Sequence, residues 1–311
     1  MNGQNANSLI PFQPVKPEDL ELYKKYIPDN YSRGCEFSFA NLYLWGRQNI
    51  AEIHGHIALF SQFNCRSVYP WPVGNGDRKA VIDAIIEDSK QRGISCRITG
   101  LSPEARETLE SLYPGEFSFH CDEGSFDYVY SIDDLADLKG KKYHSKRNHL
   151  YRFYEAFPDW RCEPLSDTNI NEAMDMVENW YKIRYKENPN SDYQMEQVAI
   201  SKAFRHYKEL EMDGLVLYGG GEVLAVTMGS VLYDGIMDVH FEKARPDAAI
   251  AYTAINCEFA KYIRDKYPEI EFLNREEDMG LEGLRKAKKS YKPHHMAEKC
   301  WAHLREEGYE Y

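Results

Sequence analysis

Residues 273–293, LNREEDMGLEGLRKAKKSYKP, hold charged side chains of both signs close together. An amide and a guanidinium come first, three carboxylates follow, and five cations lie among the eight residues before Pro293: Asn274, Arg275, Glu276, Glu277, Asp278, Arg285, Lys286, Lys288, Lys289 and Lys292. Such a set could bind the phosphates of an activated donor through its cations and contact an amine through a carboxylate. The alternative is that the opposite charges pair with each other and only hold the start of a helix in place.

The elements around this segment predict where it lies. Residues 270–274 read as an apolar strand, and residues 281–291 have helical spacing. Ligands of open α/β sheets bind beyond the carboxyl ends of strands, so the segment is expected to border a cleft. Its expected donor ligands are Asn274, Arg275, Arg285 and Lys288. We expect Glu276 or Asp278 to orient the acceptor.

Polar side chains also alternate along the predicted strand 234–244, where Asp238, His240 and Glu242 fall on one face. Acyl transfer to an amine needs a base for the amine's proton and donors for the carbonyl oxygen on which charge develops. His240 or Glu242 is the expected base, and Tyr291 is the expected acid for the leaving group. The alternatives are a histidine satisfied by neighbours in a half-buried sheet and a tyrosine in the core.

A basic run at 139–152 contains no acidic residue, although the chain as a whole is acidic. Lys146 and Arg147 are expected to contact phosphate, either in a tRNA acceptor stem or in a nucleotide donor, and Asn148 to contact the donor's sugar or base. Counterion release would make such binding weaken steeply with salt. The alternative is a solvated, charged helix face.

The predicted helix start at 245–252 could bind an anion, because the first amides of a helix lack partners within it. Alanines stand there in place of the glycines that let backbone approach a phosphate. Asp247 is expected to cap the helix, and its carboxylate would compete with a phosphate. Coenzyme A binding at this helix therefore stays open. Gly219–Gly221 reads as a hairpin turn.

The chain divides into two halves with a similar order of elements, each with an early helical part, a hairpin, and then alternating strands and helices. The first half contains a hairpin at 50–62 and helices at 77–93 and 102–115. The second contains helices at 169–187 and 194–210, a hairpin at 215–232, and the strands and helices that carry the candidate residues. This order predicts a mixed α/β fold with an α+β mixed sheet, divided into domains at residues 1–140 and 141–311.

That element order resembles the GNAT acyl-CoA N-acyltransferase fold, and several short blocks resemble a bacterial family grouped with the C-terminal domain of lysyl-phosphatidylglycerol synthases. The blocks are NREEDMG at 274–280, LRKAKKSYKP at 284–293, HFEKA at 240–244 with Lys243 as a further candidate ligand, KYHSKRN at 142–148, and FSFANLYLW at 37–45. The resemblance implies two tandem GNAT-like domains. In the named relatives it implies transfer of an aminoacyl group from tRNA to a lipid.

Composition excludes several classes of protein. The net charge of −12 and the pI of about 5.4 argue against a duplex-DNA binder. Seven cysteines without a CxxC motif, and histidines without metal-ligand spacing, predict neither a disulfide framework nor a metal site, and favour the cytoplasm. The N-terminal residues do not read as a signal peptide, and no apolar run of about 18 residues predicts a membrane span.

The resulting hypothesis is a cytoplasmic transferase that moves an acyl or aminoacyl group from a phosphate-bearing donor to an amine or hydroxyl. The donor, aminoacyl-tRNA or acyl-coenzyme A, would be a co-substrate and not a permanently bound cofactor. The acceptor would be a small molecule, a peptide or a lipid. The alternatives are a coenzyme A-dependent small-molecule N-acetyltransferase and a non-catalytic binding protein that retains the fold.

Overall fold

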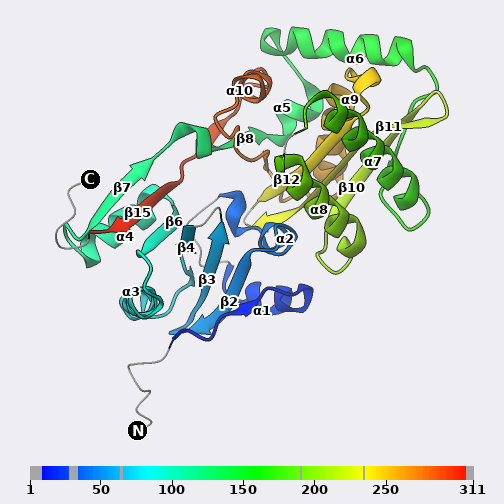
Figure 1. Cartoon of the computed structure of the whole chain (residues 1–311). Coiled ribbons are helices and arrows are strands. Elements are labelled where there is room, and N and C mark those ends of the chain that lie inside the picture. The colour runs from blue at the N-terminus through cyan, green and yellow to red at the C-terminus, as the bar shows by residue number, and fades with distance from the viewer. Residues whose placement is uncertain (1–8, 28–33, 64–65, 190, 234, 306–311) are drawn as a thin grey trace.

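The computed structural model describes residues 9–27, 34–63, 66–189, 191–233 and 235–305. Two mixed sheets form its framework (Figure 1). The first has the order β1-β2-β3-β4-β6-β15-β7, with β5 on β3: β1 Gln13–Pro14, β2 Gln48–Ile53, β3 His56–Phe63, β4 Arg66–Pro70, β5 Val73–Gly74, β6 Arg97–Leu101, β7 Phe117–Cys121 and β15 Cys300–Leu304. The second has the order β14-β8-β13-β12-β11-β10-β9: β8 Asp127–Ser131, β9 Arg161–Pro164, β10 Asp213–Gly219, β11 Glu222–Tyr233, β12 Ile236–Ala244, β13 Phe272–Asn274 and β14 His295–Ala297.

The helices cover these sheets. In the first half they are α1 Leu20–Tyr23, α2 Phe39–Leu44, α3 Arg78–Arg92, α4 Pro103–Leu112 and α5 Ile132–Asp137. In the second half they are α6 His144–Ala156, α7 Ile170–Glu187, α8 Ser191–His206, α9 Ala251–Lys266 and α10 Glu282–Lys289. Short 3-10 turns lie at Pro17–Asp19, Cys35–Phe37, Glu123–Ser125, Lys141–Tyr143 and Pro246–Ala248. The predicted mixed α/β architecture is confirmed. Pro17 and the acids after it predict a helix over residues 17–28; of its described part, residues 17–27, the structure forms a 3-10 turn and the short α1.

Local sequence signals explain several of these elements. The turn between β2 and β3 places His54 at a φ of 49° and Gly55 at a φ of 72°, the left-handed pair that a two-residue hairpin requires. Ser102 accepts a hydrogen bond from the amide of Ala105 at 3.2 Å and so caps α4. Both features follow the sequence prediction.

The two sheets exchange strands at the end of the chain. The sequence predicts one strand over residues 294–305, but the structure has two: β14 pairs with β8 in the second sheet, and β15 lies between β6 and β7 in the first (Figure 1). β8 itself precedes residue 140 and belongs to the second sheet. The domain boundary at residue 140 stays a prediction. Strands on either side of it pair with each other: β8 with β13 and β14, and β15 with β6 and β7.

A disulfide accompanies this exchange. Cys121 in β7 and Cys300 in β15 lie directly opposite each other and are bonded, with their Cα atoms 4.3 Å apart. The expectation that the cysteines form no disulfides is wrong for this pair, because the two residues are 179 positions apart and carry no local pairing signal. They meet only because the last strand of the chain adds to the first sheet.

The second sheet opens at its centre. β12 and β13 are parallel and pair only at Ile236–Asp238 with Phe272–Asn274. Beyond this point β12 continues along β11 to Ala244, whereas β13 ends, so the two strands separate. Helix α9 packs on one side of the sheet, and α7 and α8 pack on the other, in a hydrophobic core shared with the first sheet. In the part of the chain that is described, no helix has the length and apolar character needed to cross a membrane.

Candidate functional site

A β-bulge interrupts β12 where it leaves β13. β11 pairs Gly229 with Val239 and Met228 with Phe241, so His240 is an extra residue without a partner of its own. A bulge breaks the two-residue alternation of side chains along a strand. It therefore changes which face of the sheet the following residues occupy.

The bulge separates the three side chains that the sequence predicts on one face. Asp238 and His240 face the first sheet, where both lie within contact distance of Asn41 in α2. Glu242 faces the opposite side, where it accepts a hydrogen bond from Asn256 in α9 at 3.2 Å. The prediction of one shared face is wrong for Glu242, because the extra residue at 240 shifts the alternation.

On the α9 face, four of the predicted residues meet at the opening between β12 and the segment after β13. We call Lys146, Glu242, Arg275 and Tyr291 the α9-side cluster. Arg275 Nη2 donates to Glu242 Oε1 at 2.8 Å, and the Arg275 guanidinium lies 5.0 Å from the centre of the Tyr291 ring. Lys146 Nζ lies 3.6 Å from the centre of the same ring, on α6. Segments distant in the sequence thus converge on one phenol.

The α9-side cluster has two cations and one carboxylate. No carboxylate oxygen of the described residues lies within ion-pairing distance of Lys146 Nζ, so Glu242 is paired with Arg275 alone. Burial, with a further contribution from the Arg275 charge, lowers the pKa of Lys146 to about 8. Burial raises the pKa of Tyr291, whose hydroxyl donates to Thr253 Oγ1 at 3.4 Å. The surplus positive charge suits an anionic group of a substrate.

On the opposite face lies a larger and mostly acidic group, which we call the junction cluster because both sheets contribute to it. Its members are Cys35, Glu36, Asn41, Asp127, Asp238, His240, Asn274, Glu276, Glu277 and Lys299. Five carboxylates thus surround one lysine in a region where most side chains are buried. The lysine stands directly before β15, and so the strand exchange places it there.

Lys299 and Asp127 form the centre of the junction cluster. Lys299 Nζ donates to Asp127 Oδ1 at 2.7 Å, and the other carboxylate oxygen accepts from the amide of Cys35 at 2.6 Å and from Asn274 Nδ2 at 3.0 Å. Burial alone would lower the pKa of Lys299, but Asp127 and the neighbouring acidic groups raise it well above its usual value. Lys299 is therefore a permanent buried cation. Asn274, predicted to hold a donor, instead holds Asp127.

Asp238, His240 and Glu276 form the second part of the junction cluster. His240 Nδ1 lies 3.5 Å from Asp238 Oδ2 and 3.6 Å from Glu276 Oε1, and Nε2 lies 2.8 Å from Ser230 Oγ. The His240 side chain is only 1% exposed. Burial and the nearby Glu276 charge raise the pKa of Asp238 well above its usual value. The expected base His240 therefore has both ring nitrogens engaged inside the protein.

Two of the cations on α10, Arg285 and Lys288, have partners within the protein. Asp278 Oδ2 accepts from Arg285 Nε at 2.7 Å and from the Tyr128 hydroxyl at 2.6 Å, and hydrogen bonding by Arg285 lowers the pKa of Asp278 to about 2. Lys288 Nζ donates to the backbone carbonyls of residues 275, 276 and 277 at 2.5, 3.0 and 2.5 Å. Arg285 and Lys288 therefore fix the loop at 275–278, which positions Arg275 and Glu276.

The residues of the basic run at 139–152 have different surroundings. Lys139 and Lys142 pair with Asp137 and Asp134, each at 2.7 Å. Arg147 donates to the carbonyls of residues 138 and 140 at 2.5 and 2.7 Å, and Asn148 Nδ2 lies 3.3 Å from His144 Nε2 on an exposed face of α6. Of the three donor ligands predicted in this run, Lys146 is the one that reaches the α9-side cluster among the described residues.

Lys243 lies away from the opening. Its Nζ donates to Glu196 Oε1 at 2.7 Å and stands 4.2 Å from the centre of the Trp180 ring. These partners come from α8 and α7, on the side of the sheet opposite α9. The ion pair links β12 to those helices, so Lys243 stabilises the packing between them.

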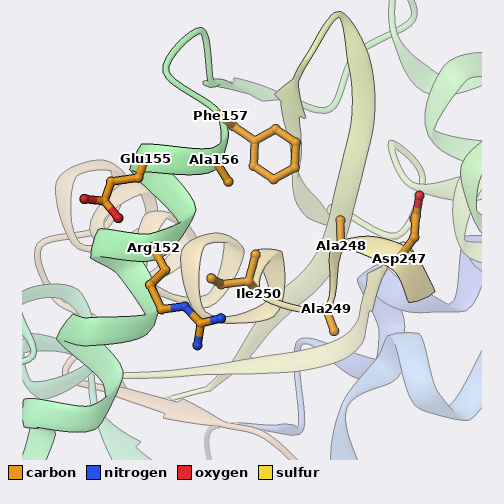
Figure 2. Close-up of a pocket in the computed structure, with 8 residues that line it drawn as sticks. All are labelled: Arg152, Glu155, Ala156, Phe157, Asp247, Ala248, Ala249 and Ile250. Carbon is orange, nitrogen blue, oxygen red and sulfur yellow. The ribbon is translucent and has the colours of Figure 1, made fainter.

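A pocket of about 560 Å³ lies where α6 ends and α9 begins (Figure 2). It is lined by Arg152, Glu155, Ala156, Phe157, Asp247, Ala248, Ala249 and Ile250. The Arg152 guanidinium extends into the space beside Ile250 (Figure 2). Asp247 pairs with Arg245 at 2.6 Å, and the side chain at the start of α9 makes no capping hydrogen bond, so the predicted Asp247 cap is wrong. The first amides of α9 are left without a side-chain cap.

The sequence matches the family described as "Phosphatidylglycerol lysyltransferase, C-terminal" over residues 31–303. The chain belongs to this family. No functionally curated protein shows significant similarity to it. A conserved protein of unknown function from Bacteroides thetaiotaomicron is similar over 96% of this chain and 100% of its own, with 34% identity and a TM-score of 0.90.

Two further solved structures share the fold. The structure of L-PGS from Bacillus licheniformis has a TM-score of 0.68 at 14% identity and covers 94% of this chain and 93% of its own. FemX has a TM-score of 0.59 at 10% identity over 94% of this chain and 97% of its own. The fold is therefore a tandem pair of GNAT-like domains, and the family is one of aminoacyl transferases.

Sequence reasoning missed several residues that this member of the family buries at the junction: Glu36, Asn41, Asp127 and Lys299. Asn41 lies in the FSFANLYLW block, which was noted only for its resemblance and its aromatic residues. Asp127 is the first residue of the otherwise uncharged strand β8, and Lys299 lies directly before β15, 172 residues away. A single charged residue at or directly before the start of an otherwise uncharged strand was the available signal, since buried charges require a partner.

Proposed function

We propose that this chain transfers an aminoacyl group from aminoacyl-tRNA to an amine or hydroxyl acceptor. The observation that carries the proposal is the α9-side cluster at the opening between β12 and β13. Two cations, a carboxylate and a phenol stand together there in a chain of an aminoacyl-transferase family. Opposite the opening lies the acidic junction cluster, so the two sides carry charges of opposite sign.

In this proposal one side of the opening binds the anionic part of the donor, and the other side contacts an amine. Lys146 and Arg275 bind an anionic part of the donor, because their two charges face only Glu242. Glu276 directly follows Arg275 in the loop after β13, has a side chain 22% exposed, and contacts the amine of the aminoacyl or acceptor group. Arg285 and Lys288 act indirectly, through the loop that they hold.

The chemical step follows from the side chains at the opening. The acceptor nitrogen or oxygen attacks the ester carbonyl of the donor, the new amide or ester bond forms, and the bond to the ribose oxygen breaks. Glu242 takes the acceptor's proton, and Tyr291 supplies a proton to the departing oxygen. His240 is not assigned this role, since its ring lies on the other face of β12, against Ser230 and Asn41.

Binding of aminoacyl-tRNA tests the proposal. Retention of bulk aminoacyl-tRNA should fall steeply between about 50 and 200 mM salt, because phosphate contacts release counterions. Lys146→Ala should weaken binding about tenfold, which corresponds to about 1.4 kcal/mol. Lys141→Ala is the matched control, since Lys141 lies in the same basic run on the exposed surface. Equal affinity of both variants, or binding that does not respond to salt, would contradict the proposal.

A second candidate, coenzyme A-dependent acyl transfer, is favoured by the pocket at the start of α9. Uncapped amides and the Arg152 guanidinium border it, and both are suited to a pyrophosphate. Acetyl-coenzyme A should then raise the melting temperature, and Arg152→Ala should abolish the increase. A melting temperature that acetyl-coenzyme A leaves unchanged would remove this candidate and leave aminoacyl-tRNA as the donor.

A further inference from the structure

Three ligand-forming side chains of the junction cluster are arranged closely around one point. Asp238 Oδ2, His240 Nδ1 and Glu276 Oε1 all lie within 4.8 Å of one another. Two of the separations are 3.5 and 3.6 Å, both measured from the histidine nitrogen. The side chains of Asp238 and His240 are 0% and 1% exposed, so water does not compete freely for these atoms.

The separations distinguish between two kinds of cation. Ligands about 2.0–2.1 Å from a tetrahedral metal ion lie about 3.4 Å from one another. Acceptors about 2.8 Å from an ammonium nitrogen lie about 4.6 Å apart. The observed 3.5 and 3.6 Å agree with the first value and are too short for the second. The geometry therefore favours a metal ion over the amino group of a substrate.

A second observation points to a missing cation at the same place. Asp238 Oδ1 is buried and has no hydrogen-bond partner among the described residues. A buried carboxylate oxygen without a partner is costly, and a cation bound through both oxygens of the carboxylate would satisfy it. The unpartnered atom belongs to the same carboxylate whose other oxygen faces His240.

The surroundings of the three side chains match the outer shell of a metal site. Ser230 Oγ lies 2.8 Å from His240 Nε2 and can accept its proton; Nδ1 would then exchange its 3.1 Å contact with Asn41 Oδ1 for the metal ion. The Asn41 side chain contacts all three groups: its Nδ2 lies 3.2 Å from Asp238 Oδ2 and 3.0 Å from Glu276 Oε1, and its Oδ1 lies 3.1 Å from His240 Nδ1. Asn41 thus fixes the orientation of the whole set.

We propose that Asp238, His240 and Glu276 bind one divalent transition-metal ion, with Mn²⁺ and Zn²⁺ the best suited by ligand type. An imidazole nitrogen with two carboxylates favours these ions over Mg²⁺ and Ca²⁺, which prefer oxygen alone. The ion would neutralise charge in the junction cluster and link β12 to the loop after β13. The site shares Glu276 with the proposed function, but metal binding is measured without donor or acceptor, so failure of the one is distinguishable from failure of the other.

The test measures metal binding by the whole chain, without a polyhistidine tag, after treatment with EDTA. Titration with Mn²⁺ and separately with Zn²⁺, followed by calorimetry and elemental analysis, should give one ion per chain. Glu276→Gln should weaken binding on the order of 100-fold, whereas the neighbouring Glu277→Gln, the matched control, should retain it. Ser230→Ala should weaken binding by about 10- to 100-fold, as loss of an outer-shell partner does.

Folding is checked separately from binding. Each variant is compared with the parent chain by circular dichroism and thermal unfolding in metal-free buffer, and affinities are read only from variants that unfold cooperatively. Co²⁺ serves as a spectroscopic probe, whose visible absorption should appear in the parent chain and be lost in His240→Gln. The proposal is overturned if the parent chain binds none of these ions, or if Glu276→Gln and Glu277→Gln bind equally. Stabilisation by ethylamine with no response to metal would also overturn it.

Discussion

The two faces of β12 hold clusters of opposite character. On the α9 face, Lys146 and Arg275 outnumber Glu242, and the group borders an opening. On the other face, five carboxylates surround Lys299, and most of the group is buried. One extra residue at His240 separates them, because it changes the side on which the strand presents its side chains. A single bulge thus lets one strand contribute to two electrostatic environments.

Removing the cation of the junction cluster tests the difference between the two clusters most directly. Lys299→Met should lower the free energy of unfolding by about 3–5 kcal/mol, because Asp127 is then left as a buried charge without its partner. Lys139→Ala removes an exposed pair with Asp137 and should change stability by less than about 1 kcal/mol. Urea denaturation measures both. Similar values for the two variants would show that Lys299 is not central to the cluster.

A smaller effect is expected from the loop that supports the α9-side cluster. Asp278→Asn should cost about 2 kcal/mol of stability, since it weakens hydrogen bonds from Arg285 and Tyr128 to a charged oxygen. Donor affinity should fall with it, because the loop also carries Arg275. Lys286→Ala, on the exposed face of α10, is the control and should change stability by less than about 0.5 kcal/mol. Loss of stability without any loss of donor binding would separate the loop from the site.

The smallest effect is a dependence on pH at Lys146. The groups that face this amine are Arg275, Glu242 and Tyr291, with His149 beside it on α6. Its pKa of about 8 means that its charge is present below pH 8 and is lost as the pH rises through that value. Donor affinity should therefore decrease about tenfold between pH 7 and pH 9. Lys146→Arg keeps the positive charge over this pH range and should remove the decrease in donor affinity. A decrease that persists in the variant would show that another group titrates.

The sequence predicts the α9-side cluster better than the junction cluster. Arg275, Glu242 and Tyr291 follow the strand ends and helix faces that local patterns indicate, and Lys146 was the member of the basic run that reached them. The pairing of Lys299 with Asp127 was not accessible, because it depends on a final strand that crosses to the other sheet. The bulge at His240 leaves no local signal either, since the strand pattern continues through it.

Charge patterns alone also failed to separate binding residues from supporting ones. Arg285 and Lys288 have the residue types and the spacing of a phosphate-binding site. In the structure Arg285 donates to Asp278, and Lys288 donates to three backbone carbonyls. A side chain's partners depend on the loop that faces it, and the conformation of that loop is set by tertiary contacts. The proposed metal ligands illustrate the same limit, because Glu276 joins Asp238 and His240 only in the folded chain.

The crossing of the final strand has a consequence for biosynthesis. Residues 13–121 supply every strand of the first sheet except β15, which lies between β6 and β7 and follows all of them in the sequence. During synthesis the first sheet therefore keeps an empty interior position until residues 300–304 have been made. The first sheet cannot be completed by the N-terminal half of the chain alone.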